Sequence, residues 1–149
     1  MEIKDSGTRR EFATGAVRDI QEGKGRCDLM PLQVVSKVMS GDQIVSDIAN
    51  FKEDYNTKHL YVALHRFGRD YYENEYEMLL EVAKHFEAGA LKYGENNWQK
   101  GLPVNCYIDS ALRHYLKFKR GDDDEPHSRS FVWNLMCCIW EVDYHDTNN

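Results

Sequence analysis

An acidic turn with the sequence GDDDEPH, residues 121–127, carries the side chains best suited to chemistry. Clusters of oxygen ligands suit Mg²⁺ or Mn²⁺, and a histidine adds a further ligand or a proton carrier. The first two aspartates are explained by the positive N-terminal end of the helix that follows, which favours acidic residues. Asp124, Glu125 and His127 together are therefore candidates for a metal site in which the histidine is a ligand or carries a proton.

Polar side chains that could bind a ligand also lie on two of the predicted long helices. Asp109, Arg113 and Lys117 follow one another at four-residue steps. Arg113 and Lys117 could grip phosphate oxygens, and an ion-paired solvent face explains the same spacing. His114 lies nearer the apolar side, where a core histidine is the default. Asn134 lies on an otherwise apolar face, where a core amide with satisfied hydrogen bonds and a ligand contact are equally good explanations.

The segment EAGALKYGENNWQKG, residues 87–101, runs from a helix end into a turn. Its candidate site residues are Glu87, Lys92, Asn97 and Trp98. Trp98 has a flat apolar ring that could stack on a nucleobase, although a tryptophan is more often a packing residue. The asparagines could simply form the turn.

A short basic segment, GKGRCD at residues 23–28, contributes Lys24, Arg26 and Asp28. It lacks the G-x-x-x-x-G-K-[ST] pattern of a phosphate loop. The segment could lay its cations over an anionic ligand, and a solvated linker is the alternative.

Helical periodicity predicts the elements that position these residues. We expect helices over about 31–39, from Asp42 to about 51, less clearly over 57–67, and then three long ones over 76–93, 103–118 and 131–142. The buried stripe of the first long helix is expected to include Leu79, Leu80 and Phe86. No segment shows the alternation of a strand, so the predicted fold is an all-α helical bundle.

The predicted organisation is an irregular arm over 1–30, a helical domain over 31–143 and a tail over 144–149. The 149 residues suit one core. Nineteen Lys and Arg against 25 Asp and Glu give a net charge of −6, which argues against duplex nucleic acid as a partner. Four cysteines without a C-x-x-C pair indicate reduced thiols in a cytoplasm-like compartment. The longest apolar run is too short for a membrane span.

Four blocks together are more specific than any one of them: GKGRCDLMPL, FEAGALKYGENNW, YIDSALRHYLKFKRGDDDEPH and FVWNL. In this order, over about residues 9–142, they resemble the N-terminal domain family of dATP/dGTP diphosphohydrolases, found largely in bacteriophages. The family is loosely similar to the all-α nucleotide pyrophosphatases of the MazG type.

This resemblance implies removal of pyrophosphate from a purine deoxynucleoside triphosphate in a host cytoplasm, with Mg²⁺ or Mn²⁺ as cofactor. It implies that Glu87, Asp124 and Glu125 bind metal, and that Glu87, Glu125 and His127 activate water. The substrate-binding residues would be Lys24, Arg26, Asp28, Lys92, Asn97, Trp98, Arg113, His114, Lys117 and Asn134. By analogy with MazG-type enzymes we expect a homo-oligomer.

Two features depart from the pattern of relatives. The E-x-x-E pair of MazG-type enzymes is not evident, and Ser130 stands where many relatives have a second histidine. Both features favour an alternative function, a non-catalytic phage protein that binds and sequesters a nucleotide or a nucleotide-derived signal.

Overall fold

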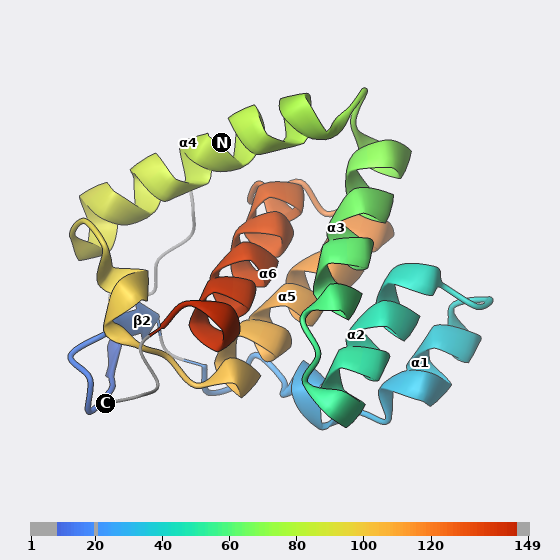
Figure 1. Cartoon of the computed structure of the whole chain (residues 1–149), viewed down its shortest axis with the longest axis horizontal. Helices are drawn as coiled ribbons and strands as arrows, with labels where there is room; N and C mark the ends of the chain where they lie inside the picture. The colour runs from blue at the N-terminus through green and yellow to red at the C-terminus, as the bar shows by residue number, and fades with distance from the viewer. Residues whose placement is uncertain (1–8, 20, 146–149) are drawn as a thin grey trace.

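The computed structural model describes residues 9–19 and 21–145, and its architecture is a helical bundle (Figure 1). The helices are α1 (Leu32–Val38), α2 (Gln43–Asp54), α3 (Lys58–Tyr71), α4 (Glu75–Tyr93), α5 (Val104–Arg120) and α6 (His127–Asp143). Two short 3₁₀ helices, η1 (Cys27–Leu29) and η2 (Asn97–Lys100), precede α1 and α5. The predicted all-α fold built on three long helices is therefore confirmed.

Helices α5 and α6 form the centre of the bundle. Their facing sides bury Tyr107, Leu112, Tyr115, Phe131 and Leu135 almost completely. Removing such large apolar side chains from water is the main favourable contribution to folding. Helix α5 ends at Gly121, whose positive φ of 92° lets the chain turn back into the acidic segment. That turn brings the end of α5 and the start of α6 side by side.

The arm contains a hairpin that the sequence did not predict. Strands β1 (Arg9–Glu11) and β2 (Val17–Asp19) pair antiparallel, with Arg10 opposite Arg18. Three-residue strands are too short to show an alternating pattern, so nothing local distinguished them from irregular chain. Residues 1–8 and 146–149, at the outer ends of the predicted arm and tail, lie outside the described residues.

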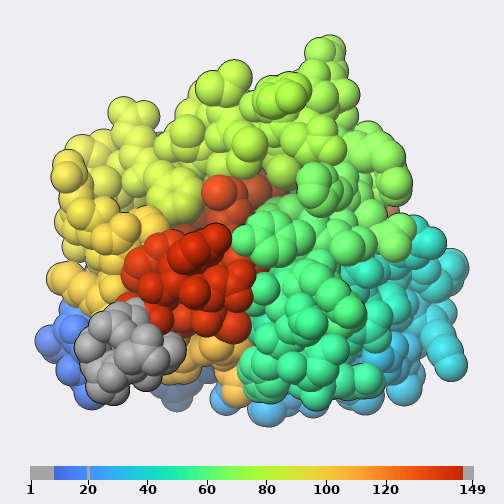
Figure 2. Space-filling view, viewed as in Figure 1, coloured from blue at the N-terminus to red at the C-terminus, as the bar shows by residue number. Residues whose placement is uncertain are grey.

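Helix α4 lies across the bundle beside α6, and its buried face differs from the predicted one (Figure 1). It buries Met78, Val82 and His85, whereas Leu79 and Leu80 are 45% and 72% exposed. The apolar stripe of α4 is wider than the strip of this helix that contacts the rest of the bundle. The expectation that Leu79 and Leu80 belong to the core was therefore wrong. The space-filling view shows α6 between α4 and α3 on this face (Figure 2).

Within the described residues, no helix has the length and apolarity needed to cross a membrane.

Candidate functional site

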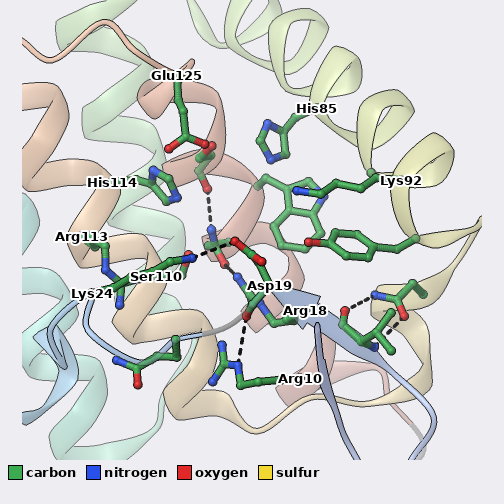
Figure 3. A pocket seen from close by; sticks show the side chains of 18 of the residues that line it. Arg10, Arg18, Asp19, Lys24, His85, Lys92, Ser110, Arg113, His114 and Glu125 are labelled. Carbon is green, nitrogen blue, oxygen red and sulfur yellow. Dashed lines mark hydrogen bonds and ion pairs between the residues drawn. The ribbon is translucent and has the colours of Figure 1, made fainter. Parts of the chain in front are cut away.

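A cavity of about 470 Å³ lies between β2, α4, α5 and α6 (Figure 3). Its size falls within the usual range of small-molecule sites, about 300–1,000 Å³. His85 and Lys92 reach it from α4, and Arg113 and His114 reach it from α5 on the opposite side. Glu125 lies at one end and Arg18 toward the other. The cavity therefore collects side chains that are far apart in the sequence.

The cavity is basic although the chain as a whole is acidic. The basic side chains that line it are Arg10, Arg18, Lys24, Lys92, Arg113 and Lys117, and the carboxylates are Asp19, Asp124 and Glu125. Cations thus outnumber carboxylates two to one here, in a chain of net charge −6. A concave wall focuses the resulting positive potential, which favours an anionic ligand.

Arg18, on β2, is a cation of the cavity wall whose guanidinium group is partly buried and incompletely hydrogen-bonded. Its Nη2 donates to Asn134 Oδ1 over 3.1 Å, and its guanidinium lies over the rings of Tyr107 and Trp133. Its Nη1 is fully buried and has no hydrogen-bond partner among the described residues. Burial lowers the pKa of Arg18. A buried donor without an acceptor is costly, and a ligand oxygen would satisfy it.

Asn97 holds β2 in place from the turn after α4. Its Nδ2 donates to the carbonyl of Val17, and its Oδ1 accepts from the Val17 N–H, each over 2.9 Å. This two-point contact resembles a strand pairing and fixes the residue next to Arg18. Asn97 lines the cavity, but its amide is used for positioning.

Arg113 ties the arm to α5. It donates to the carbonyl of Gly25 over 2.9 Å and pairs with the buried Asp109 one turn earlier. Asp109 in turn accepts from the N–H of Cys27 over 2.6 Å. The Nε of Arg113 is buried without a partner among the described residues. The four-residue spacing therefore produces an ion pair, as one sequence interpretation held, but the pair faces the arm and the cavity rather than solvent.

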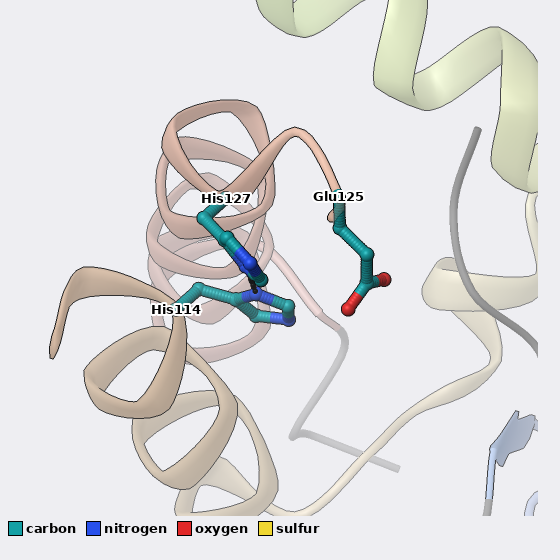
Figure 4. A group of neighbouring side chains, drawn as sticks. All are labelled: His114, Glu125 and His127. Carbon is teal, nitrogen blue, oxygen red and sulfur yellow. Dashed lines mark hydrogen bonds between the residues drawn. The ribbon is translucent and has the colours of Figure 1, made fainter. Parts of the chain in front are cut away.

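Two histidines meet where α5 ends and α6 begins (Figure 4). His114 Nδ1 and His127 Nδ1 are 2.9 Å apart, and His127 Nε2 lies 2.7 Å from Asp124 Oδ1. Burial and the neighbouring His127 lower the pKa of His114 well below its ordinary value. Glu125 projects toward His114, and one ligand atom from each of His114, Glu125 and His127 lies within 4.8 Å of the others. These three residues could hold a metal ion.

Comparison with known proteins places the chain in a family. The sequence profile described as "dATP/dGTP diphosphohydrolase, N-terminal" matches residues 50–148, more than half of the chain. The chain belongs to this family. A protein of Salmonella phage PMBT28 named dATP/dGTP diphosphohydrolase is 30% identical over 74 residues, which cover 46% of this chain and 25% of that protein. The matched region thus spans about a quarter of that relative's length. No solved structure matches significantly.

The family match includes α3 to α6 and leaves out the arm, which supplies part of the cavity wall. Within the arm, Lys24 lines the cavity and pairs with Asp19 over 3.0 Å. Arg26 and Asp28 do not line it, and they form a two-point ion pair with each other at 2.8 Å.

Glu87 and Trp98 are two further predicted site residues that the structure separates from the cavity. Glu87 is exposed, because it lies two residues beyond His85 and so about 200° round the helix from the cavity-facing side. Trp98 packs edge-on against Phe86 and Trp140, with ring centroids 5.7 and 5.0 Å away. Its packing matches the ordinary explanation for a tryptophan.

The remaining predicted residues meet at or beside the cavity: Lys92, Asn97, Arg113, His114, Lys117, Asp124, Glu125 and Asn134 line it, with His127 behind His114. Sequence reasoning missed other residues of the wall: Arg10, Arg18, His85, Tyr93, Ser110 and Trp133. Ser130 also lines it. A signal for Trp133 was available in the sequence, because it stands next to Asn134 in the FVWNL block, but no role was predicted for it.

Proposed function

We propose that this protein hydrolyses a purine deoxynucleoside triphosphate to the monophosphate and pyrophosphate, with the help of a divalent cation. The observation that carries the proposal is the basic cavity with a carboxylate and two histidines at one end. A triphosphate needs several cations along its length, and its cleavage needs metal-binding groups at one point of it. Membership of the family and the name of the phage relative support the same substrate class.

In this proposal the phosphates lie between β2, the end of α4 and the middle of α5. Arg18 offers the buried Nη1, which has no acceptor among the described residues. Lys92 and Lys117 line the cavity from α4 and α5 and act as point charges. These cations offset the negative charge of the bound triphosphate and of the departing pyrophosphate.

The base would lie against the aromatic part of the wall. Tyr93 and Trp133 both line the cavity, and a purine offers a larger face for stacking than a pyrimidine does. In this arrangement Trp133 takes the stacking role that the sequence assigned to Trp98.

Cleavage would take place beside Glu125, which is 9% exposed. His114, His127 and Glu125 would hold the divalent cation, which when bound neutralises phosphate charge and polarises a water molecule. The water oxygen bonds to the α-phosphorus, the bond from that phosphorus to the bridging oxygen breaks, and pyrophosphate leaves. The Glu125 carboxylate accepts the proton that the water loses. Asp124 positions His127 through its contact with Nε2.

The test is to incubate the purified chain with each of the four deoxynucleoside triphosphates and Mg²⁺ or Mn²⁺, and to quantify monophosphate and pyrophosphate by chromatography. We expect equal amounts of both products from dGTP or dATP, and much less from the pyrimidine nucleotides. Glu125→Gln should abolish product formation while leaving the circular dichroism spectrum unchanged. The matched control is Glu53→Gln, because Glu53 is exposed on α2 and does not line the cavity.

The contrary outcome is also specific. Stoichiometric binding of a purine nucleotide without release of pyrophosphate from any of the four would overturn the hydrolase. It would favour a nucleotide-sequestering protein instead, the function to which Ser130 and the missing E-x-x-E pair point.

A further inference from the structure

We propose that His114, His127 and Glu125 form a nitrogen-rich site that selects a transition-metal dication such as Mn²⁺, Co²⁺ or Zn²⁺ over Mg²⁺, and that the site binds this ion before nucleotide arrives. The proposal deepens the proposed function by naming the class of metal. Metal binding can nevertheless be measured without any nucleotide, so the two claims can fail separately.

The two imidazoles and the Glu125 carboxylate lie close enough to share one ion. One ring nitrogen of each histidine and one carboxylate oxygen of Glu125 lie within 4.8 Å of one another. His114 Nδ1 and His127 Nδ1 are 2.9 Å apart, at hydrogen-bond distance, so one of them carries a proton in the absence of an ion. Binding of an ion replaces that proton, as metal binding to histidine generally requires.

Asp124 prepares His127 for this role. Its Oδ1 lies 2.7 Å from His127 Nε2, so this nitrogen carries the proton and donates it to the carboxylate. The lone pair of His127 then lies on Nδ1 and faces His114. A carboxylate that orients a metal-binding histidine in this way is a common feature of metal sites. His127 is 2% exposed, so water does not replace these contacts.

Ligand type decides the class of ion. Mg²⁺ prefers six oxygen ligands and keeps several waters, whereas imidazole nitrogen suits later first-row metals such as Zn²⁺, and the affinity of a site that contains nitrogen rises from Mn²⁺ to Co²⁺. With two nitrogens and one oxygen, the three side chains match a transition metal.

A second group of possible ligands, Asp122, Asp124 and His127, fits the cavity less well. Asp122 forms an ion pair with Arg120 and does not line the cavity. His114 and Glu125 do line it, beside Arg113 and Lys117. An ion on these two residues therefore meets the phosphates, whereas an ion at Asp122 would not.

The experiment titrates the metal-free chain with Co²⁺ and records the visible absorption bands, and measures Mn²⁺, Zn²⁺ and Mg²⁺ binding by calorimetry. We expect one ion per chain, new Co²⁺ bands with nitrogen ligands, and affinity for Mn²⁺ about tenfold or more above that for Mg²⁺. His114→Ala should remove the bands, and Asp124→Asn should weaken binding about 10- to 100-fold. His65→Ala is the control, because His65 is exposed on α3.

Co²⁺ bands that persist in a folded His114→Ala variant would overturn the proposal, as would Mg²⁺ binding as tightly as Mn²⁺. If His114→Ala does not fold, Glu125→Gln replaces it as the test and should lower the affinity for Co²⁺. An unchanged affinity for Co²⁺ in Glu125→Gln would overturn the proposal. Full pyrophosphate release by His114→Ala with Mg²⁺ would refute the metal site and leave the hydrolase standing. Tight Co²⁺ binding by a chain that cleaves no nucleotide would support the metal site and refute the hydrolase.

Discussion

Arg18 donates a hydrogen bond to Asn134 over 3.1 Å, and Asn134 in turn donates to the carbonyl of Ser130 over 2.8 Å. A polar residue of α6 thereby fixes the direction of a cation that comes from the arm. The Nη1 of Arg18 is buried and has no hydrogen-bond partner among the described residues, so a ligand oxygen could bind there. Asn134 is thus a buried amide with satisfied hydrogen bonds, and in the proposed function it acts through Arg18.

Replacing Arg18 should therefore separate binding from stability. Arg18→Met keeps an unbranched apolar side chain and removes a buried charge and an unpaired donor, which offsets the loss of the bond to Asn134, so the melting temperature should change little. Binding of an α,β-methylene analogue of dGTP should weaken about 10- to 100-fold in calorimetry, because a charge-assisted hydrogen bond is lost. Arg69→Met, at an exposed site on α3, changes the net charge equally and should bind normally. Wild-type affinity in Arg18→Met would refute the role.

Asn97→Ala should act mainly through stability. The variant loses two hydrogen bonds to Val17, which should lower the free energy of unfolding by about 2 kcal/mol. Nucleotide affinity should fall with it, because β2 carries Arg18. Urea denaturation and calorimetry measure the two effects, and Asn105→Ala, exposed on α5, is the control. Weaker binding with unchanged stability would instead make Asn97 a direct ligand contact.

His85 should make the protein less stable in acid. Burial, with repulsion from Arg129, Arg18 and Lys92, lowers the pKa of His85 to about 4, from an ordinary value of 6.5. Between these two values the unfolded chain binds the additional proton, so the free energy of unfolding falls as the pH falls through this window and levels off below it.

Unfolding in urea at about pH 7.5 and about pH 5 should reveal this contribution. His85→Gln should lose about 2 kcal/mol less than the wild type over that range. His65→Gln, at an exposed position, should behave as the wild type does. An equal loss in His85→Gln and the wild type would show that His85 is not the group responsible.

Two tryptophans should show opposite effects. Trp98→Ala removes a ring that packs on Phe86 and Trp140, so the free energy of unfolding should fall by about 3 kcal/mol while the affinity of folded protein for nucleotide stays unchanged. Trp133→Leu should weaken nucleotide binding, because Trp133 lines the cavity. Tight binding by Trp133→Leu, with weak binding by Trp98→Ala, would restore the stacking role to Trp98.

A substitution of Glu87 tests directly which side of α4 faces the cavity. Glu87→Gln should leave the rate of pyrophosphate release unchanged, because the side chain is exposed and lies away from the cavity. Steady-state rates with dGTP and dATP measure this. Loss of turnover in a folded Glu87→Gln variant would place Glu87 in the catalytic site, as the family resemblance first implied.

The sequence by itself determined the long helices and the grouping of Asp124, Glu125 and His127, because helical periodicity and a short acidic turn are local properties. It also placed Arg113, His114 and Lys117 on one stretch of helix, and these residues do line or adjoin one cavity. Their proximity to the acidic turn follows from the chain reversal at Gly121.

Only the tertiary structure decided which side of α4 faces inward and what the arm does. Periodicity shows that a helix has an apolar side, but the angle at which α4 crosses α6 sets the line of contact, which buries His85 and leaves Leu80 and Glu87 exposed. Arg18 could not be found from its neighbours in sequence. Its place in the cavity depends on Asn97 and Asn134, far along the chain, and such long-range contacts leave no local pattern.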